Sequence, residues 1–275
     1  MFKMYDLNMK EIPFPDGLMP LDIFVSSISK KRATEEIEGR NGVVDYGTNY
    51  VDRSVELSMW INSSDTIDYR LLRNEIYALF DTGNAFYIEE TRVPSRVLKV
   101  AVDESFIPDR LTKRNASVDV TCRTLDSVFW ESKYTTLELH DRGYTATAEK
   151  YGLVDNIDDE KVKYRFTESN FSVYNAGNVT VEPESMLLNI NVNAVQSDNN
   201  FTIRNKTTGE EVILKRESKG SHFRIQGMVI SLGSITNIFR DTNRRFISLA
   251  PGDNQFEILN GTFEEIRFEF KYYYK

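Results

Sequence analysis

The residues best suited to chemistry are few and lie far apart in this sequence. The 275-residue chain has two histidines, His140 and His222, and one cysteine, Cys122. No HExxH or CxxC spacing links residues of these types, so the sequence predicts no metal site. Cys122 alternates with Val118 and Val120 along an expected strand, which favours a small buried hydrophobe over a catalytic thiol.

Paired carboxylates can share the acid and base roles of a glycosidase, and adjacent pairs such as Glu89-Glu90, Asp158-Asp159 and Glu264-Glu265 occur. Neighbouring residues on a strand point to opposite faces, and these pairs stand in charged surroundings, so we expect solvated surface. No glycine-rich phosphate loop of the GxxxxGK[ST] or GxGxxG type is present. The sequence therefore indicates neither an enzyme nor a bound cofactor.

The overall composition narrows the classes of partner. The net charge of -8 disfavours a protein that grips nucleic acid, which needs a basic surface. The N-terminus lacks a basic stretch followed by an apolar run, and no segment approaches the ~18 consecutive apolar residues of a membrane span. We therefore expect a protein made in a cytoplasm, with no membrane contact and no specific binding to nucleic acid.

Period-two alternation predicts strands over much of the chain. The longest example runs from Val51 to Ile61, where one face carries Val51, Arg53, Val55, Leu57, Met59 and Ile61. Arg53 shares the phase of the apolar residues, so we expect it to point inward and to meet a carboxylate or backbone carbonyls. Asp45 and a neighbouring copy of the chain are both possible partners. The alternative is a bulge that turns Arg53 towards solvent.

One segment has a helical period. After the expected N-cap region at Ser64-Asp65, apolar residues recur at three- and four-residue spacing, which predicts a helix over residues 66–81 that Gly83 terminates. The charged stretch 156–163 places a domain junction near residue 150. We therefore expect a mainly β fold of two domains, 1–150 with the single helix and 151–275 as an all-β sandwich.

The segment Lys30–Tyr50 is polar, is punctuated by glycines and has no apolar periodicity of its own. Two interpretations fit this pattern: a floppy loop, or an arm that a partner orders. The residues alone favour the loop.

Two motif groups go beyond a generic β protein. The first is Gly39-Arg40-Asn41-Gly42, then Asp45, Gly47, Tyr50 and Arg53, followed by the strand, the helix and Pro94-Ser95-Arg96. The second contains Asn175-Ala176-Gly177 with Pro183, the turn Asn205-Lys206-Thr207-Thr208-Gly209, and Leu249-Ala250-Pro251-Gly252-Asp253-Asn254. In this order they resemble the distal tail proteins of siphophages that infect Gram-positive bacteria.

The resemblance implies a split-barrel-like N-terminal sandwich with an extended belt onto the neighbouring copy, and a galectin-like C-terminal sandwich. It therefore reverses the preference for Lys30–Tyr50 from a loop to an arm. It also implies a hexameric ring at the virion tail tip, synthesised in the bacterial host. The ring would join the tail tube protein to a tip protein of the tail-associated lysin type, with a receptor-binding protein as a further partner, and would surround the DNA channel. The residues expected at the interface between copies are Gly39, Arg40, Gly42, Tyr46, Tyr50 and Arg53.

Two other functions stay open at this point. The C-terminal sandwich could be a carbohydrate-binding module for host cell-wall polysaccharide, with rings from Phe201, Tyr174 and Tyr272-Tyr273-Tyr274 stacking on sugars. The chain could also be a tube-forming protein of a tail or secretion machine. Glycan titration tests the former, and long stacks in place of single rings would indicate the latter.

Overall fold

The computed structural model describes residues 1–81, 83–141 and 158–275. The chain divides into two compact units, Met1–Trp130 and Glu131–Lys275. The division lies earlier than the junction expected near residue 150, which falls outside the described residues. Within the described ranges, no helix is long and apolar enough to span a membrane.

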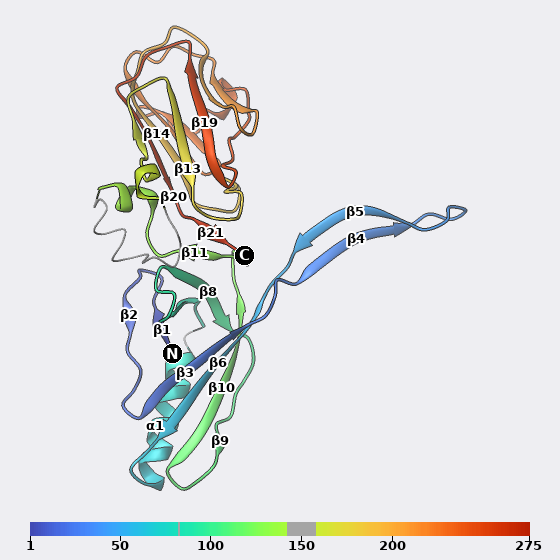
Figure 1. Ribbon diagram of the computed structural model, residues 1–275, viewed down its shortest axis with the longest axis vertical. Coiled ribbons are helices and arrows are strands. Elements are labelled where there is room, and N and C mark those ends of the chain that lie inside the picture. Colours follow the sequence, from blue (N-terminus) through green and yellow to red (C-terminus); the bar gives the residue numbers. More distant parts are fainter. Residues whose placement is uncertain (82, 142–157) are drawn as a thin grey trace. The chain divides into compact units, whose positions relative to one another are not determined.

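The first unit is built on an antiparallel sheet whose strands follow the order β2-β1-β7-β8-β10-β6-β3, with β9 paired to β10 (Figure 1). The expected alternation at residues 51–61 becomes β6, which starts three residues later than predicted. The strands are β1 (Phe2–Tyr5), β2 (Glu11–Ile12), β3 (Leu18–Val25), β6 (Ser54–Asn62), β7 (Phe86–Glu90), β8 (Arg96–Val102), β9 (Asp109–Arg110) and β10 (Asn115–Thr124).

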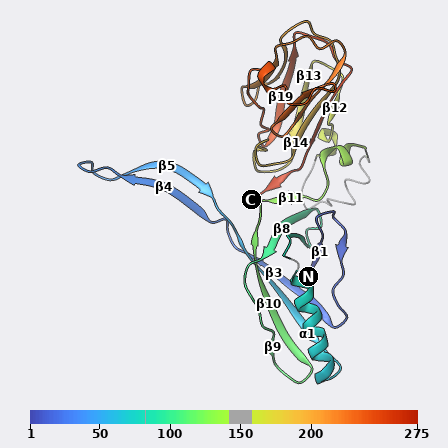
Figure 2. The ribbon, with the colours of Figure 1, turned by 180° about the vertical axis from the view of Figure 1, so that it is seen from behind.

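The helix of this unit, α1 (Thr66–Phe80), confirms the predicted helical segment. Asp65 caps its N-terminus, because one carboxylate oxygen accepts from Ile67 N at 2.7 Å and from Asp68 N at 2.9 Å. The last helical residue is Phe80, and the C-cap residue Asp81 donates its backbone N–H to Tyr77 O. Gly83 then has a left-handed φ of +59°, as expected at the end of this helix. The helix packs its apolar face on the sheet (Figure 2), where its buried side chains are Tyr69, Leu72, Ile76 and Phe80.

The second unit is a sandwich of a five-stranded and a four-stranded sheet, which confirms the mainly β fold. The first sheet has the order β12 (Arg165–Phe166), β20 (Glu265–Phe270), β14 (Leu188–Val195), β17 (Ser221–Gln226) and β18 (Val229–Leu232). The second has the order β13 (Asn170–Asn175), β19 (Gly252–Leu259), β15 (Phe201–Asn205) and β16 (Glu210–Leu214). Short elements complete the unit: β11 (Trp130–Ser132) paired with β21 (Tyr273–Tyr274), and two 3-10 turns, Asp159–Lys161 and Phe239–Asp241.

Phenylalanines from both sheets fill the core of this sandwich. Phe268, fully buried on β20, lies 4.8 Å from Phe256 of β19 between ring centroids. Phe171 of β13 stacks on Phe256 at 5.6 Å with the two rings nearly parallel. Such aromatic pairs add about 0.5–1.5 kcal/mol each beyond the burial of their area. Ile266, Phe268 and Phe270 alternate along β20, and all three are fully buried in this core.

Candidate assembly interface

The residues alone leave the segment between β3 and β6 open as a loop or an arm, and the resemblance favours the arm. This segment forms a two-stranded antiparallel hairpin of β4 (Lys30–Glu36) and β5 (Val43–Tyr50), which projects from the sheet (Figure 1). Every residue of β4 is exposed, and on β5 only Val44 is partly covered. The hairpin, called the arm below, is thus neither a floppy loop nor part of the core.

The arm continues the β3–β6 pair. Ser26 N donates to Ser54 O at 2.9 Å, Ser29 N donates to Asp52 O at 3.0 Å, and Val51 N donates to Ser29 O at 3.0 Å. These bonds continue the antiparallel pairing of β3 with β6 into the pairing of β4 with β5, in which Lys30 is opposite Tyr50. The sheet therefore fixes the root of the arm, while its outer part gains stability only from its own ladder. An isolated two-stranded hairpin is marginally stable in water.

The tip of the arm contains three of the six expected interface residues. Gly39 and Gly42 have φ angles of +81° and +86°, a left-handed conformation that side chains with a Cβ rarely adopt. Arg40 lies between them, fully exposed, and its backbone N donates to Ile37 O at 3.1 Å. The two glycines therefore shape the turn that displays Arg40, with Val43 57% exposed beside it.

Polar contacts join the two strands of the arm halfway along. The Tyr46 hydroxyl donates to a Glu35 carboxylate oxygen at 2.6 Å, and this hydrogen bond raises the pKa of Tyr46. Arg32 Nε lies 3.7 Å from Asp45 Oδ2. Asp45 therefore faces Arg32 and is not the partner of Arg53 that the sequence suggested. The Tyr46 ring stays 63% exposed, available to a partner.

Arg53 lies at the root of the arm and points inward, as its phase predicted. It is 8% exposed, and its Nε donates to the carbonyl oxygen of Ser26 at 2.9 Å. Its backbone N donates to Thr124 Oγ1 at 3.0 Å. Burial lowers the pKa of the guanidinium, and Nη1 is buried with no hydrogen-bond partner among the described residues. Arg53 thus fastens the end of β3 to the start of β6, at the cost of one unsatisfied donor.

We expect Arg53→Ala to lower the free energy of unfolding of the first unit by about 1–3 kcal/mol, because it removes the Ser26 contact and the packing of the side-chain stem. Arg53→Met keeps the stem and removes the unsatisfied donor, so its loss is expected to be smaller. Urea unfolding of both variants measures the two losses of unfolding free energy and shows which is larger. Equal stability of Arg53→Ala and the unchanged protein would contradict the fastening role.

The interface residues named from sequence do not form one cluster. Gly39, Arg40 and Gly42 lie at the tip, Tyr46 lies midway, and Tyr50 and Arg53 lie at the root. The Tyr50 ring contacts Phe129 edge-on, with ring centroids 5.6 Å apart. Sequence reasoning missed the exposed apolar side of the neighbouring edge strand β3, where the exposed side chains are Met19, Leu21 and Phe24. Their signal was faint because β3 does not alternate regularly.

The motifs of the second unit build its turns. The side chains of Asn175, Asn205 and Asn254 are each at most 1% exposed and bond backbone groups of the turns around them. Asn175 Nδ2 donates to Val179 O and Leu249 O, and its Oδ1 accepts from Gly177 N at 3.0 Å. Gly177 is required by close approach, since a Cβ there would lie 2.5 Å from Tyr273 O. These motif residues therefore act on the fold and not on a ligand.

Gly177→Ala is expected to destabilise the second unit by about 1–3 kcal/mol, because the added methyl group overlaps the backbone of Tyr273 and must displace β21. Thermal unfolding followed by near-UV circular dichroism measures the change. Ser185→Ala, at an exposed position nearby, is the matched control and should leave the transition unchanged. If Gly177→Ala unfolds at the same temperature as the control, the close approach to Tyr273 does not require glycine at this position.

The groups considered for catalysis lie apart. The described residues contain no cluster of three or more His, Cys, Asp or Glu residues that could hold a metal ion. His140 Nδ1 accepts from Tyr164 N at 3.4 Å, while His222 Nδ1 lies 3.2 Å from Asn193 Oδ1. One expectation was wrong: Glu89, on the inner strand β7, is only 3% exposed.

Cys122 is fully buried, and burial raises the pKa of its thiol to about 12. The thiolate is the nucleophilic form, so Cys122 should not react with Ellman's reagent at pH 8 in the folded protein. One equivalent of thiol should react after unfolding in guanidinium. Rapid labelling of the native protein would contradict the buried position.

Comparison with known proteins shows what this chain is similar to. Residues 13–122, within the first unit, match the model of the phage tail protein RIFT-related domain. Over its whole length the chain has the fold of the Dit protein (gp 19.1) of SPP1, a hub of the adsorption apparatus of Gram-positive infecting phages. That crystal structure superposes with a TM-score of 0.68 at 13% identity and covers 99% of each chain.

A baseplate structure of phage p2 in its activated conformation aligns less closely, with a TM-score of 0.45 and 11% identity over 98% of this chain and 97% of that one. The comparison with curated proteins found no match. The resemblance to distal tail proteins that the sequence predicted is therefore confirmed, by the domain family over residues 13–122 and by the fold over the whole chain.

The rings suggested for sugar stacking are mostly inaccessible. Phe201 and Tyr272 are fully buried, and Tyr273 and Tyr274 are 3% and 4% exposed. The Tyr273 hydroxyl accepts a hydrogen bond from Leu187 N at 3.0 Å inside the unit. Tyr174 keeps some exposure, with the Lys161 ammonium 5.1 Å from its ring centroid. These tyrosines and Phe201 form no open aromatic platform.

Proposed function

We propose that this protein is a structural hub of a phage tail tip, and that six copies close into a ring around the DNA channel. The observation that carries the proposal is the arm, a hairpin whose exposed residues and fixed root suit it to lie on another copy. A ring uses one patch on each copy and a different patch on the next, which is the pairing that an arm and a receiving surface provide.

The composition of the arm supports contact with protein. Its exposed apolar side chains include Ile37, Val43 and Tyr46, which would be covered in an assembly. The edge strand β3 adjoins the arm and exposes Met19, Leu21 and Phe24, together with one row of backbone groups that pair with no described strand. Covering both features removes apolar area from water, which stabilises association.

The proposed ring would join the tail tube protein to a tip protein of the tail-associated lysin type, and receptor-binding proteins would attach to the same hub. In this role the protein is architectural and not an enzyme, it sits at the tail tip of the virion, and the host cytoplasm supplies it. The net charge of -8 suits a channel through which DNA moves without being held.

Photo-crosslinking tests the contact that the arm makes. A benzoylphenylalanine in place of Tyr46 should produce a ladder of covalent species that ends at six copies, because this exposed ring lies in the proposed interface. The same group at His222, an exposed position of the second unit, is the control and should give no ladder. Crosslinks at His222 with none at Tyr46 would assign assembly to the second unit and contradict the proposal.

A further inference from the structure

The long connection between β18 and β19 in the second unit is fastened along the edge strand β16. Asn243 carries most of the attachment: its Nδ2 donates to Glu211 O at 2.8 Å, and its Oδ1 accepts from Ile213 N at 3.1 Å. Lys215 N donates to Asp241 O at 2.7 Å. These bonds hold residues 241–243 in place, so the side chains that follow are displayed by a fixed backbone.

Arginines without ion pairs project from this connection. Arg240, Arg244 and Arg245 are exposed, and none pairs with a carboxylate of the described residues. Most other described arginines of the same unit do pair with carboxylates, namely Arg165, Arg204, Arg216 and Arg267, whereas Arg224 does not. Arg244 also has a φ angle of +60°, a conformation that costs about 1 kcal/mol or more in a residue other than glycine. Unpaired charge on a strained, fixed segment favours a binding role over solvation alone.

An aromatic pair lies within the same segment. The rings of Phe239 and Phe246 stack with centroids 5.4 Å apart and planes 12° apart, and both rings are half-buried. Stacking fixes their orientation before any partner arrives. Flat, rigid apolar surface beside guanidinium groups is the composition that is enriched where proteins bind proteins.

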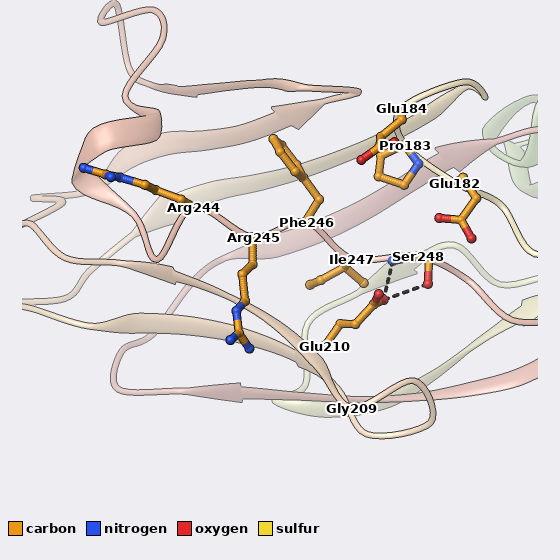
Figure 3. A pocket seen from close by; sticks show the side chains of 10 residues that line it. All are labelled: Glu182, Pro183, Glu184, Gly209, Glu210, Arg244, Arg245, Phe246, Ile247 and Ser248. Atoms are coloured by element: carbon orange, nitrogen blue, oxygen red, sulfur yellow. Dashed lines mark hydrogen bonds between the residues drawn. The ribbon is translucent and has the colours of Figure 1, made fainter. Parts of the chain in front are cut away.

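Beside Phe246 a cavity of 430 Å³ opens, lined on its other side by carboxylates. Figure 3 shows Arg244 and Arg245 on one side of Phe246, and Glu182 and Glu184 on the other. Glu210 is held there because Ser248 N and Ser248 Oγ both donate to its Oε2 at 2.7 Å. Partial burial, and then the charges of Glu210 and Glu184, raise the pKa of Glu182. The surface thus has a basic end, an apolar centre and an acidic end.

We propose that this surface, made by Arg244, Arg245, Phe246, Glu182 and Glu184, docks a segment of a partner protein that carries the reverse pattern. Acidic side chains of that segment would lie against the arginines, an apolar side chain would lie on Phe246, and a basic side chain would meet the glutamates. Phe239, stacked on Phe246, extends the apolar part of the same surface.

The pattern of charge favours a protein segment over a uniformly charged polymer. A chain of phosphates would gain from the arginines but would be repelled by the carboxylates a few residues away, because like charges at close range oppose binding. A peptide can match both signs within a short length. The docking surface lies in the second unit, whereas the arm belongs to the first.

The test uses the full-length protein and a fluorescent twelve-residue probe peptide with four glutamates, a central leucine pair and two lysines. Binding is measured by fluorescence anisotropy. We expect saturable binding that Arg245→Glu weakens by about tenfold or more, because the change replaces attraction by repulsion. Arg224→Glu is the matched control: Arg224 is exposed on β17, has no ion pair within the described part of the chain, and gives the same change in net charge.

Two further measurements separate the partner classes. An all-glutamate peptide of equal length should bind more weakly than the patterned probe, and inorganic polyphosphate should displace the probe poorly. Equal losses of probe affinity in Arg245→Glu and Arg224→Glu would overturn the proposed site, since only the net charge of the protein would then decide binding. Preferential binding of polyphosphate, or no saturable binding of the patterned probe, would also overturn the proposal.

Discussion

Replacing residues 30–50 by an Asn-Gly turn is expected to abolish ring assembly while the first unit stays folded. The sheet should tolerate the deletion because the arm ends where Ser29 and Asp52 are already joined, with Ser29 N donating to Asp52 O at 3.0 Å. A two-residue turn can close such an antiparallel pair. The free energy of unfolding should change by less than about 1 kcal/mol, since no arm strand contributes a fully buried residue.

Light scattering after size-exclusion chromatography measures assembly, and urea unfolding measures stability. The matched control is Ile107→Ser, which removes a side chain that is 84% exposed outside the arm. This control should assemble as the unchanged protein does. A deletion variant that still forms six-copy rings would show that the arm is not the contact that closes the ring.

Asn254→Ala should destabilise the second unit by about 2–5 kcal/mol, one of the largest losses expected from a single substitution. Asn254 is fully buried, and its Oδ1 accepts from Ala250 N at 2.9 Å and from Asn205 Nδ2 at 3.1 Å. Its Nδ2 donates to Ala250 O at 2.8 Å and to Gly252 O at 3.1 Å. Alanine leaves these buried groups without partners and opens the turn before β19.

Unfolding should be followed with a probe of the second unit, because two units can unfold in separate steps. Asn199→Ala, at an exposed position, serves as the control and should change the free energy of unfolding by less than about 0.5 kcal/mol. A stability of Asn254→Ala within that same margin would show that the turn does not depend on the asparagine.

The sequence predicted the elements that bury one face. One hydrophobic core contains the alternating residues Leu57, Met59 and Ile61 of β6 and the helically spaced Leu72 and Ile76 of α1. The periodicity of these apolar residues was therefore enough to predict the strand and the helix. The asparagine motifs were noticed as family signals. Their physical role emerged only when the structure showed three buried amides bonded to turn backbone.

The arm could not be predicted as a hairpin because both of its faces meet solvent. Strand periodicity arises when one face is buried, and from Lys30 to Glu36 no residue is. For the same reason the sequence could not distinguish a loop from an arm. The prediction for Glu89 failed in the opposite direction, because this charged residue was expected to be exposed and is buried. Local sequence does not reveal the order of strands in a sheet, so it could not show that Glu89 lies on an inner strand.

The surface around Arg244 and Arg245 was also invisible to sequence analysis. Neighbouring arginines occur on many solvated surfaces, and the stacking of Phe239 on Phe246 depends on a connection folded against β16. These arginines combine a lack of ion pairs with the described carboxylates and a position beside the stacked Phe239 and Phe246, and only coordinates reveal that combination.

The most direct test of the central claim is the mass of the purified protein in solution over a wide concentration range, with imaging of the largest species. The account predicts a closed species of about 191 kDa, six times the chain mass of 31.8 kDa, with a central hole. A species of 31.8 kDa at every concentration would contradict the claim that this chain closes a ring by itself.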